Sequence, residues 1–145
     1  MLDKFDNKIL GLLNENARES YAEIGRKIGL SASSVRERIQ RLTDNGVIKK
    51  YTIDLDQSRL GHDLEAFVLI KLFTGKLKPF IVIVNQVKGV EKSYRVTGNQ
   101  NVLMKVALKD HKQLQEFLDK IMAFGDTTTY LVLSEITDPF QQFPC

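Results

Sequence analysis

The chain has 145 residues, 43% of them hydrophobic, and its 21 basic and 18 acidic side chains leave a formal net charge of +3. This composition is typical of a globular protein and excludes a disordered one. The longest apolar runs, Ala66–Ile70 and Phe80–Val84, are far shorter than the roughly 20 residues that cross a bilayer, so no membrane segment is expected. Asp3 and Asp6 interrupt any secretory signal, and the single cysteine, Cys145, cannot form an internal disulfide, so we expect a cytoplasmic protein.

The positive charge is concentrated in one short segment. Residues 26–50 carry seven basic and two acidic side chains, whereas residues 1–25 have a net charge of −2 and residues 51–145 are neutral. Such a concentration is typical of a surface that binds phosphate groups. Charge alone is equally compatible with a solvated helix face. The predicted secondary structure around these residues has to distinguish the two alternatives.

Three short helices are predicted in the first 45 residues. Asp3 is a plausible N-cap of the first helix, in which apolar residues recur at helical spacing from Phe5 to Leu13. The second helix begins with a capping-box pattern, Ser20–Glu23, and ends at Gly29. The third begins after Ser31, its expected N-cap, and ends at the stop signal Asp44–Gly46.

The turn between the second and third helices is too short for the two to pack antiparallel, which predicts a helix-turn-helix. The third helix has an apolar stripe of Val35, Ile39 and Leu42. Small polar and basic side chains occupy its other face, and short residues at its N-terminus allow close approach to a DNA groove. This helix is therefore the expected recognition element.

Double-stranded DNA is the predicted partner of this region. The candidate DNA-binding residues are Ser31, Ser33, Ser34, Arg36, Glu37, Arg38, Gln40, Arg41, Lys49 and Lys50. Ser33, Ser34, Glu37 and Gln40 are expected at base edges, and Arg36, Arg41, Lys49 and Lys50 at phosphates. Arg38 lies beside the apolar stripe, so a structural role, in which it pairs with a carboxylate, is an equal alternative for this residue.

The segment Val47–Leu55 is rich in β-forming residues and is predicted to be the wing of a winged helix-turn-helix. The polar stretch after it, which contains Gly61, is the best boundary in the chain. The predicted organisation is a DNA-binding domain over residues 1–56, a linker over residues 57–63 and a second domain over residues 64–145.

Six elements are predicted in the second domain. Leu64–Phe73, Val90–Thr97, Val102–Leu108 and Thr127–Ile136 have strand patterns, and Leu114–Met122 has a clear amphipathic helical pattern. The segment 79–87 has both strand propensity and helical spacing. If it is helical, the order is βαββαβ and the fold class is α+β with a ferredoxin-like domain. The open face of such a sheet needs a partner, which favours dimerisation.

The chain resembles the Lrp/AsnC family of bacterial and archaeal regulators. The segments that carry the resemblance are Leu2–Leu10, Tyr21–Gly25, Leu30–Leu42, Gly46–Ile48, Tyr51, Val96–Gly98 and Thr127–Thr129. The resemblance implies a transcription regulator that forms a dimer and often an octamer, with an amino-acid effector bound between subunits. The effector residues that it implies are Gly98, Asn99, Gln100, Asn101, Thr127, Thr128 and Thr129.

The family usually has an aspartate where this chain has Asn101. A carboxylate can pair with the ammonium group of a ligand, whereas an amide offers only a neutral hydrogen bond. We therefore expect a neutral or polar amino acid rather than a cationic one. The alternative is that Gly98–Asn101 is only a tight hairpin and that the threonines only favour β structure.

Two other functions are alternatives to a DNA-binding regulator. Some relatives of this architecture are enzymes that decarboxylate tetrapyrroles, but His62 and His111 belong to no visible catalytic or metal-ligand cluster. We therefore expect no enzyme, no cofactor and no metal. A sensor that has lost DNA binding is the other alternative, and the basic segment argues against it.

Overall fold

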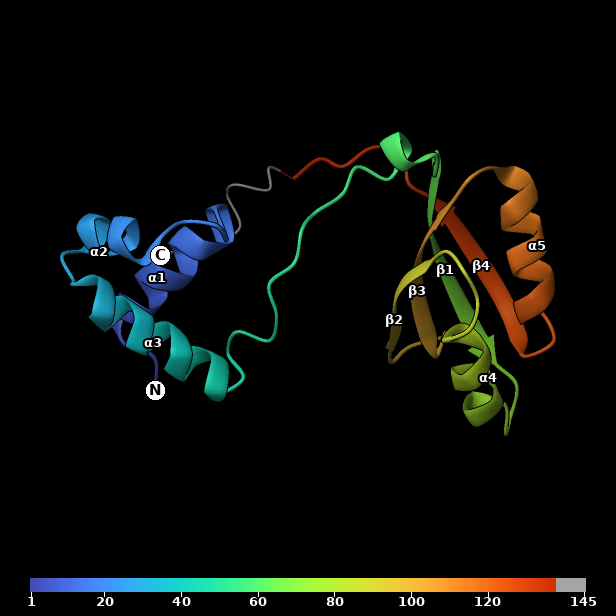
Figure 1. Cartoon of the computed structure of the whole chain (residues 1–145). Helices are drawn as coiled ribbons and strands as arrows, with labels where there is room; N and C mark the ends of the chain where they lie inside the picture. The colour runs from blue at the N-terminus through green and yellow to red at the C-terminus, as the bar shows by residue number, and fades with distance from the viewer. Residues whose placement is uncertain (138–145) are drawn as a thin grey trace. The chain divides into compact units, whose positions relative to one another are not determined.

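The computed structural model describes residues 1–137, which divide into two compact units (Figure 1). Met1–Asp54 form most of the first unit, and Leu55–Glu135 form the second. The predicted linker, residues 57–63, lies at the start of the second unit and contains a short 3-10 helix, η1 (Ser58–Leu60). Cys145 and the last residues of the predicted second domain lie outside the described residues.

The first unit consists of the three predicted helices, α1 (Lys4–Glu15), α2 (Tyr21–Ile28) and α3 (Ala32–Asp44). The side chains of Asp3, Ser20 and Ser31 cap their N-termini, as predicted. Only half of the predicted capping box at α2 forms. Ser20 Oγ accepts from the Glu23 backbone N–H, but the Glu23 carboxylate pairs with Arg26 at 2.7 Å.

The predicted apolar stripes meet in one small core, which contains Ile9, Leu13, Ile24, Val35, Ile39 and Leu42. The turn between α2 and α3 depends on two glycines. Gly29 has a φ of 77°, in the left-handed region that glycine adopts without strain. A Cβ atom at Gly25 would clash with the carbonyl oxygen of Leu30, so glycine at this position lets the turn fold back onto α2.

The predicted β structure of the wing does not form in this chain. Residues 47–55 contain no strand, and the side chains of Tyr51, Ile53 and Leu55 are exposed. A strand needs a neighbour for its backbone hydrogen bonds, and the described residues of the first unit, Met1–Asp54 among them, form no strand that could pair with this segment. Strand propensity was therefore insufficient to produce a strand here.

The second unit has the order βαββαβ, so the ambiguous segment is helical. Its elements are β1 (Leu64–Leu72), α4 (Leu77–Val84), β2 (Val90–Arg95), β3 (Val102–Leu108), α5 (His111–Ile121) and β4 (Gly125–Leu131). The strands form one antiparallel sheet in the order β2-β3-β1-β4. This arrangement confirms the predicted α+β class and ferredoxin-like topology.

The last strand is shorter than predicted because its partner ends. Leu131 pairs with Ala66, and the Val132 N–H still donates to the carbonyl oxygen of Glu65 at 2.9 Å. The register places Leu133 opposite Leu64, the first residue of β1, so the chain from Ser134 on has no neighbouring strand, and β4 ends at Leu131 rather than at the predicted Ile136.

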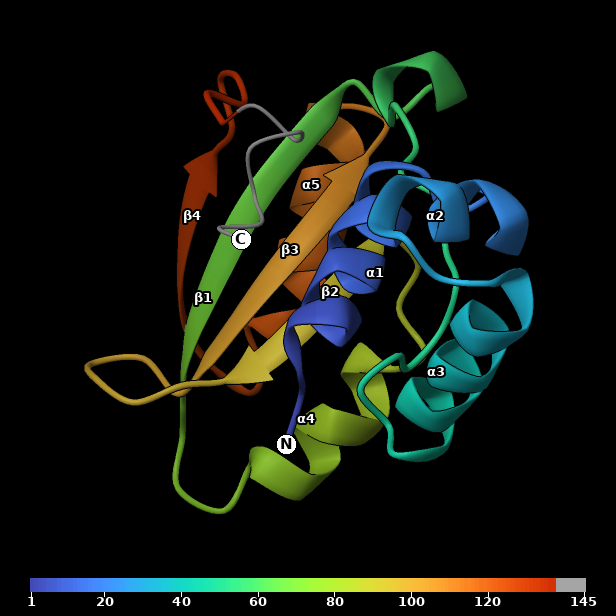
Figure 2. The same ribbon diagram turned by 90° about the vertical axis from the view of Figure 1, so that its left-hand side faces the viewer.

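The two faces of the sheet differ in burial. The even-numbered residues of β3 and those of β1 from Leu64 to Ile70 are buried and form a core with Phe80, Val84, Phe117 and Ile121 of α4 and α5. Figure 2 shows α5 behind the sheet, which leaves the other face open within this unit. Phe67, Tyr94 and Tyr130 are exposed on the open face. No helix among the described residues is long and apolar enough to cross a membrane.

Candidate functional site

The N-terminus of α3 presents a compact group of serine hydroxyls. Ser31 Oγ accepts from the Ser34 backbone N–H at 3.2 Å and lies 3.1 Å from Ser33 Oγ and 3.0 Å from Ser34 Oγ. Ser31 thus has a capping role, whereas the Ser33 side chain is exposed. The three side chains are short, so the start of the helix is not sterically shielded.

Most predicted base and phosphate contacts share the outward face of α3. A shallow hollow of about 680 Å³ is lined by Ser33, Arg36, Glu37, Gln40, Arg41, Asp44 and Asn45. Gln40 Nε2 donates to Asp44 Oδ1 at 2.8 Å. The side chains of Arg36 and Glu37 form no ion pair or hydrogen bond within residues 1–137, so both are available to a ligand.

Arg38 ties α3 to the start of α1. Its Nη1 atom lies 2.7 Å from Asp3 Oδ2 and 2.7 Å from Asp6 Oδ1. The guanidinium also lies 5.4 Å from the centre of the Phe5 ring. Of the two roles considered for Arg38, these contacts favour the structural one.

Asp6 is a buried carboxylate shared by two arginines. It is 2% exposed, and Arg41 Nη2 lies 3.2 Å from its Oδ1 atom, so Arg41 approaches the carboxylate that Arg38 also contacts. Burial opposes ionisation of Asp6, but the hydrogen bond from the Asp3 backbone N–H and the bond from Arg38 hold its pKa below the usual range. The hydrogen bonds from Arg38 to the carboxylates of Asp3 and Asp6 in turn raise the pKa of Arg38.

The role of Asp6 in this network was not predicted from the sequence. The spacing of the two acidic and the two basic residues could have indicated it. Asp3, the N-cap of α1, is followed three residues later by Asp6, and Arg38 and Arg41 are also three residues apart on α3, so the two pairs match when the helices pack. Arg41 remains 57% exposed at its side chain and so still reaches the surface.

Lys49 and Lys50 follow α3 on the segment without strand structure. Both side chains are exposed, and neither has an ion pair within residues 1–137. They extend the positive charge of the first unit beyond the recognition helix.

The predicted effector residues come partly together in the second unit. Gln100 Nε2 donates to Thr128 Oγ1 at 3.4 Å, so the hairpin turn and β4 meet within one chain. The Asn101 side chain has a structural contact, since its Oδ1 atom accepts from the Leu72 backbone N–H at 2.7 Å. Gly98, with a φ of 114°, and Asn99 are exposed at the tip of the turn.

The three threonines do not share one face. Side chains alternate along a strand, and the register pairs Thr128 with Leu69 and Thr127 with the buried Ile70. Thr128 therefore lies on the open face with Gln100, while Thr127 and Thr129 lie on the face that α4 and α5 cover. The sequence placed all three in one group because it does not reveal which face each occupies.

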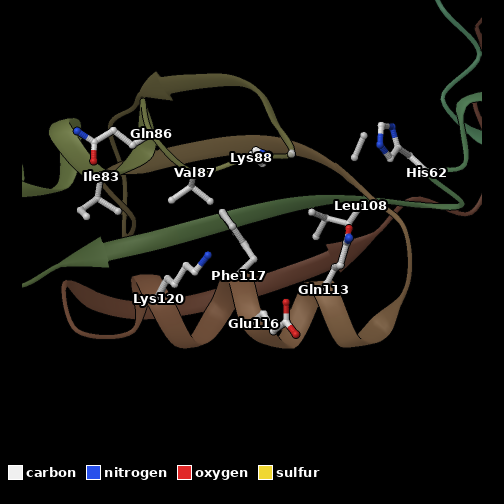
Figure 3. A pocket seen from close by; sticks show the side chains of 12 residues that line it. His62, Ile83, Gln86, Val87, Lys88, Leu108, Gln113, Glu116, Phe117 and Lys120 are labelled. Atoms are coloured by element: carbon white, nitrogen blue, oxygen red, sulfur yellow. The ribbon is translucent and has the colours of Figure 1, made fainter.

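The two histidines are separate from these surfaces. His62 Nδ1 lies 3.0 Å from Gln57 Oε1 and His111 is exposed at the start of α5. Within residues 1–137, no group of three or more His, Cys, Asp or Glu side chains is placed to hold a metal ion. His62 borders a pocket between α4 and α5 that sequence reasoning did not anticipate (Figure 3).

These features define a helix-turn-helix protein with a second, ferredoxin-like unit. The AsnC-type helix-turn-helix domain matches residues 2–43, and the Lrp/AsnC ligand binding domain matches residues 65–141. The chain therefore belongs to the Lrp/AsnC family of transcription regulators. It binds DNA through the helix-turn-helix and carries a ligand-binding domain, and the family assignment confirms the prediction that it is not an enzyme.

Similar proteins cover nearly the whole chain. The HTH-type transcriptional regulator LrpB of Bacillus subtilis is 33% identical over 138 residues, which are 93% of this chain and 91% of LrpB. The solved structure of B. subtilis LrpC has a TM-score of 0.90 at 31% identity and covers 94% of this chain and 98% of that one. A transcriptional regulator of Neisseria meningitidis, solved in complex with L-Met, has a TM-score of 0.89 at 27% identity and covers 95% of this chain and 94% of that one.

Proposed function

We propose that α3 reads DNA sequence with the outward face described above. Ser33, Ser34, Glu37 and Gln40 contact base edges. Arg36, Arg41, Lys49 and Lys50 contact phosphates. The observation that carries this proposal is the hollow on α3, which gathers Ser33, Glu37 and Gln40 beside Arg36 and Arg41.

We assign the remaining two candidates to the support of this face. Ser31 caps α3, and Arg38 holds the helix against Asp3 and Asp6. A recognition helix must be fixed in orientation if a few short side chains are to reach specific base edges. Arg38 therefore acts on DNA recognition through the position of α3.

The effector in this proposal is a neutral or polar amino acid. Its site includes the hairpin turn Gly98–Asn101, with Gln100 and Thr128 as the paired side chains on the open face. The L-Met complex of the Neisseria relative supports an amino acid of this kind. Asn101 provides no carboxylate for an ammonium group, so a cationic side chain gains nothing from it.

We further propose that the protein is a homodimer that assembles into a higher oligomer such as an octamer, and that it acts in the cytoplasm. The open face of the sheet exposes Phe67, Tyr94 and Tyr130 together, and a second copy covers them economically. A dimer also reads two half-sites about one helical turn or a multiple of it apart, which predicts a pseudo-palindromic operator.

The experiment that tests the regulatory function is a genome-wide pull-down of DNA bound by the full chain, with and without added amino acids. We expect a small set of sites that share a pseudo-palindromic motif, and we expect occupancy to change with a neutral amino acid. Recovery of DNA without any shared motif would contradict sequence-specific recognition.

A further inference from the structure

The second unit contains a pocket on the helical side of the sheet, away from the open face. It has a volume of about 540 Å³ and lies between the end of α4, the turn that follows it, the end of β3 and α5. Figure 3 shows Gln113, Phe117 and Lys120 of α5 on one side of it and Ile83 and Val87 on the other. The volume is within the range of sites for small organic molecules.

The floor of this pocket is apolar. Phe117 and Leu108 are almost fully buried, and Val87 and Ile83 are half-buried. Gly89 lines one side, where a Cβ atom would lie 2.5 Å from the Leu108 side chain and 3.0 Å from the carbonyl oxygen of Ala107, so glycine lets this turn lie against the end of β3. The floor therefore suits the apolar body of a ligand, such as an aromatic ring or a branched aliphatic chain.

The rim carries hydrogen-bond donors and positive charge. Lys88 and Lys120 are exposed and have no ion pair within residues 1–137. Gln113 Oε1 accepts from the Lys109 backbone N–H at 2.9 Å, which leaves the amide N–H₂ of Gln113 free to donate. Glu116 is the single acidic side chain of the lining, and in Figure 3 it stays at the level of the α5 ribbon.

His62 borders the pocket from the segment before β1. Gln57 Oε1 can only accept a hydrogen bond, so Nδ1 of His62 is the donor at 3.0 Å and Nε2 is left to meet a ligand. With two unpaired lysines and one carboxylate, the lysine and carboxylate side chains of the lining have a net positive charge.

We propose that this pocket is a second small-molecule site, distinct from the hairpin turn, and that it binds an organic anion with an apolar body. Lys120 binds the acidic head group, Lys88 and the amide of Gln113 add positive charge and a donor elsewhere on the rim, and Phe117 and Val87 pack against the apolar body. The pocket and the Gln100–Thr128 pair share no lining residue, so the two sites are separable by mutation.

The test uses the full chain and the fluorescent probe 8-anilinonaphthalene-1-sulfonate, which combines aromatic rings with an anionic sulfonate. Lys120→Gln removes one rim charge, and Lys112→Gln removes a charge from the same helix outside the pocket. We expect the probe to bind about two- to fivefold more weakly to K120Q, the size expected for one screened charge pair, and to bind K112Q with unchanged affinity.

A second pair of variants places a carboxylate instead of removing a cation. Gln86→Glu adds one at the rim, and Gln115→Glu adds one on α5 outside the lining. Both positions are exposed, so both variants should keep the wild-type unfolding temperature. Of these two variants, we expect Q86E to bind the probe more weakly than the wild type and Q115E to bind it with unchanged affinity.

The neutral compound N-phenyl-1-naphthylamine has the same rings without the sulfonate, so its affinity should be the same for wild type and K120Q. The absence of probe binding to the wild-type protein would overturn the proposal. Equal probe affinity for the wild type, K120Q and Q86E would also overturn it, because the dye would then bind elsewhere. An equal loss of both compounds in K120Q would contradict the role assigned to charge.

Discussion

Asp6 is the residue whose change tests the architecture of the first unit most sharply. Asp6→Asn keeps the shape of the side chain but removes the charge that attracts Arg38 at 2.7 Å and Arg41 at 3.2 Å. Hydrogen bonds to charged groups contribute about 1.5–3 kcal/mol each, and the amide retains one neutral acceptor. Both arginines are partly exposed, so we expect a net loss of about 2 kcal/mol rather than the sum.

For a unit of this size, such a loss corresponds to a fall in unfolding temperature of roughly 10 °C. Circular dichroism measures the temperature, and hydrogen exchange read on peptides from Met1–Asp54 assigns the change to the first unit. Asp44→Asn is the matched control, because this carboxylate lies on the surface of α3 and should leave the unfolding temperature unchanged.

The stabilisation by Asp6 also depends on pH. Its folded pKa lies below the usual value of 3.8, so its contribution is complete above that value and is lost as the pH falls through the folded pKa. The difference between wild type and D6N should therefore shrink in acid. A difference of less than about 2 °C at neutral pH would refute the network.

Four further predictions concern binding and assembly. Arg41→Ala should weaken binding to all DNA sequences and lower the log–log salt slope by about 0.9, and an unchanged slope would remove Arg41 from the phosphate contacts. Arg38→Ala should lower the unfolding temperature of the first unit and leave the salt slope unchanged, and a slope change with no loss of stability would make Arg38 a DNA contact. Sedimentation at micromolar concentration should give at least a dimer, and Tyr130→Asp should shift the protein towards monomer, whereas a monomeric wild type would contradict the proposed use of the open face. Calorimetry with all twenty amino acids should show that the wild type does not prefer lysine or arginine, and that Asn101→Asp binds the ligand's ammonium group more tightly. Tight lysine binding by the wild type would overturn the electrostatic argument. If none of the twenty amino acids gives a binding heat, the hairpin turn is purely structural.

Periodicity and capping residues were sufficient to predict the helices and most strands. Helix ends are local features, so Asp3, Ser20 and Ser31 could be identified as caps from the residues near them. The helical segment around Phe80 was ambiguous because its β-branched residues also have strand propensity. Its position between β1 and β2 resolved the ambiguity, since a helix there covers one face of the sheet.

The features that sequence reasoning missed depend on contacts between distant segments. The ends of β4 and the absence of a wing strand follow from which strands have neighbours, and propensity contains no such information. The sharing of Asp6 by Arg38 and Arg41 requires the packing of α1 against α3. The pocket beside Phe117 requires four segments to be placed together, so no single motif indicated it.

A salt titration of DNA binding tests the central account most directly. It compares wild type, Arg36→Ala and Gln40→Ala on an operator recovered by the pull-down and on mixed-sequence DNA. We predict that R36A lowers the salt slope by about 0.9 and keeps the ratio of specific to non-specific affinity, because Arg36 contacts phosphate. Q40A should keep the slope and lower that ratio about tenfold, because Gln40 contacts a base edge. If both variants retain the wild-type slope and ratio, the outward face of α3 does not read DNA.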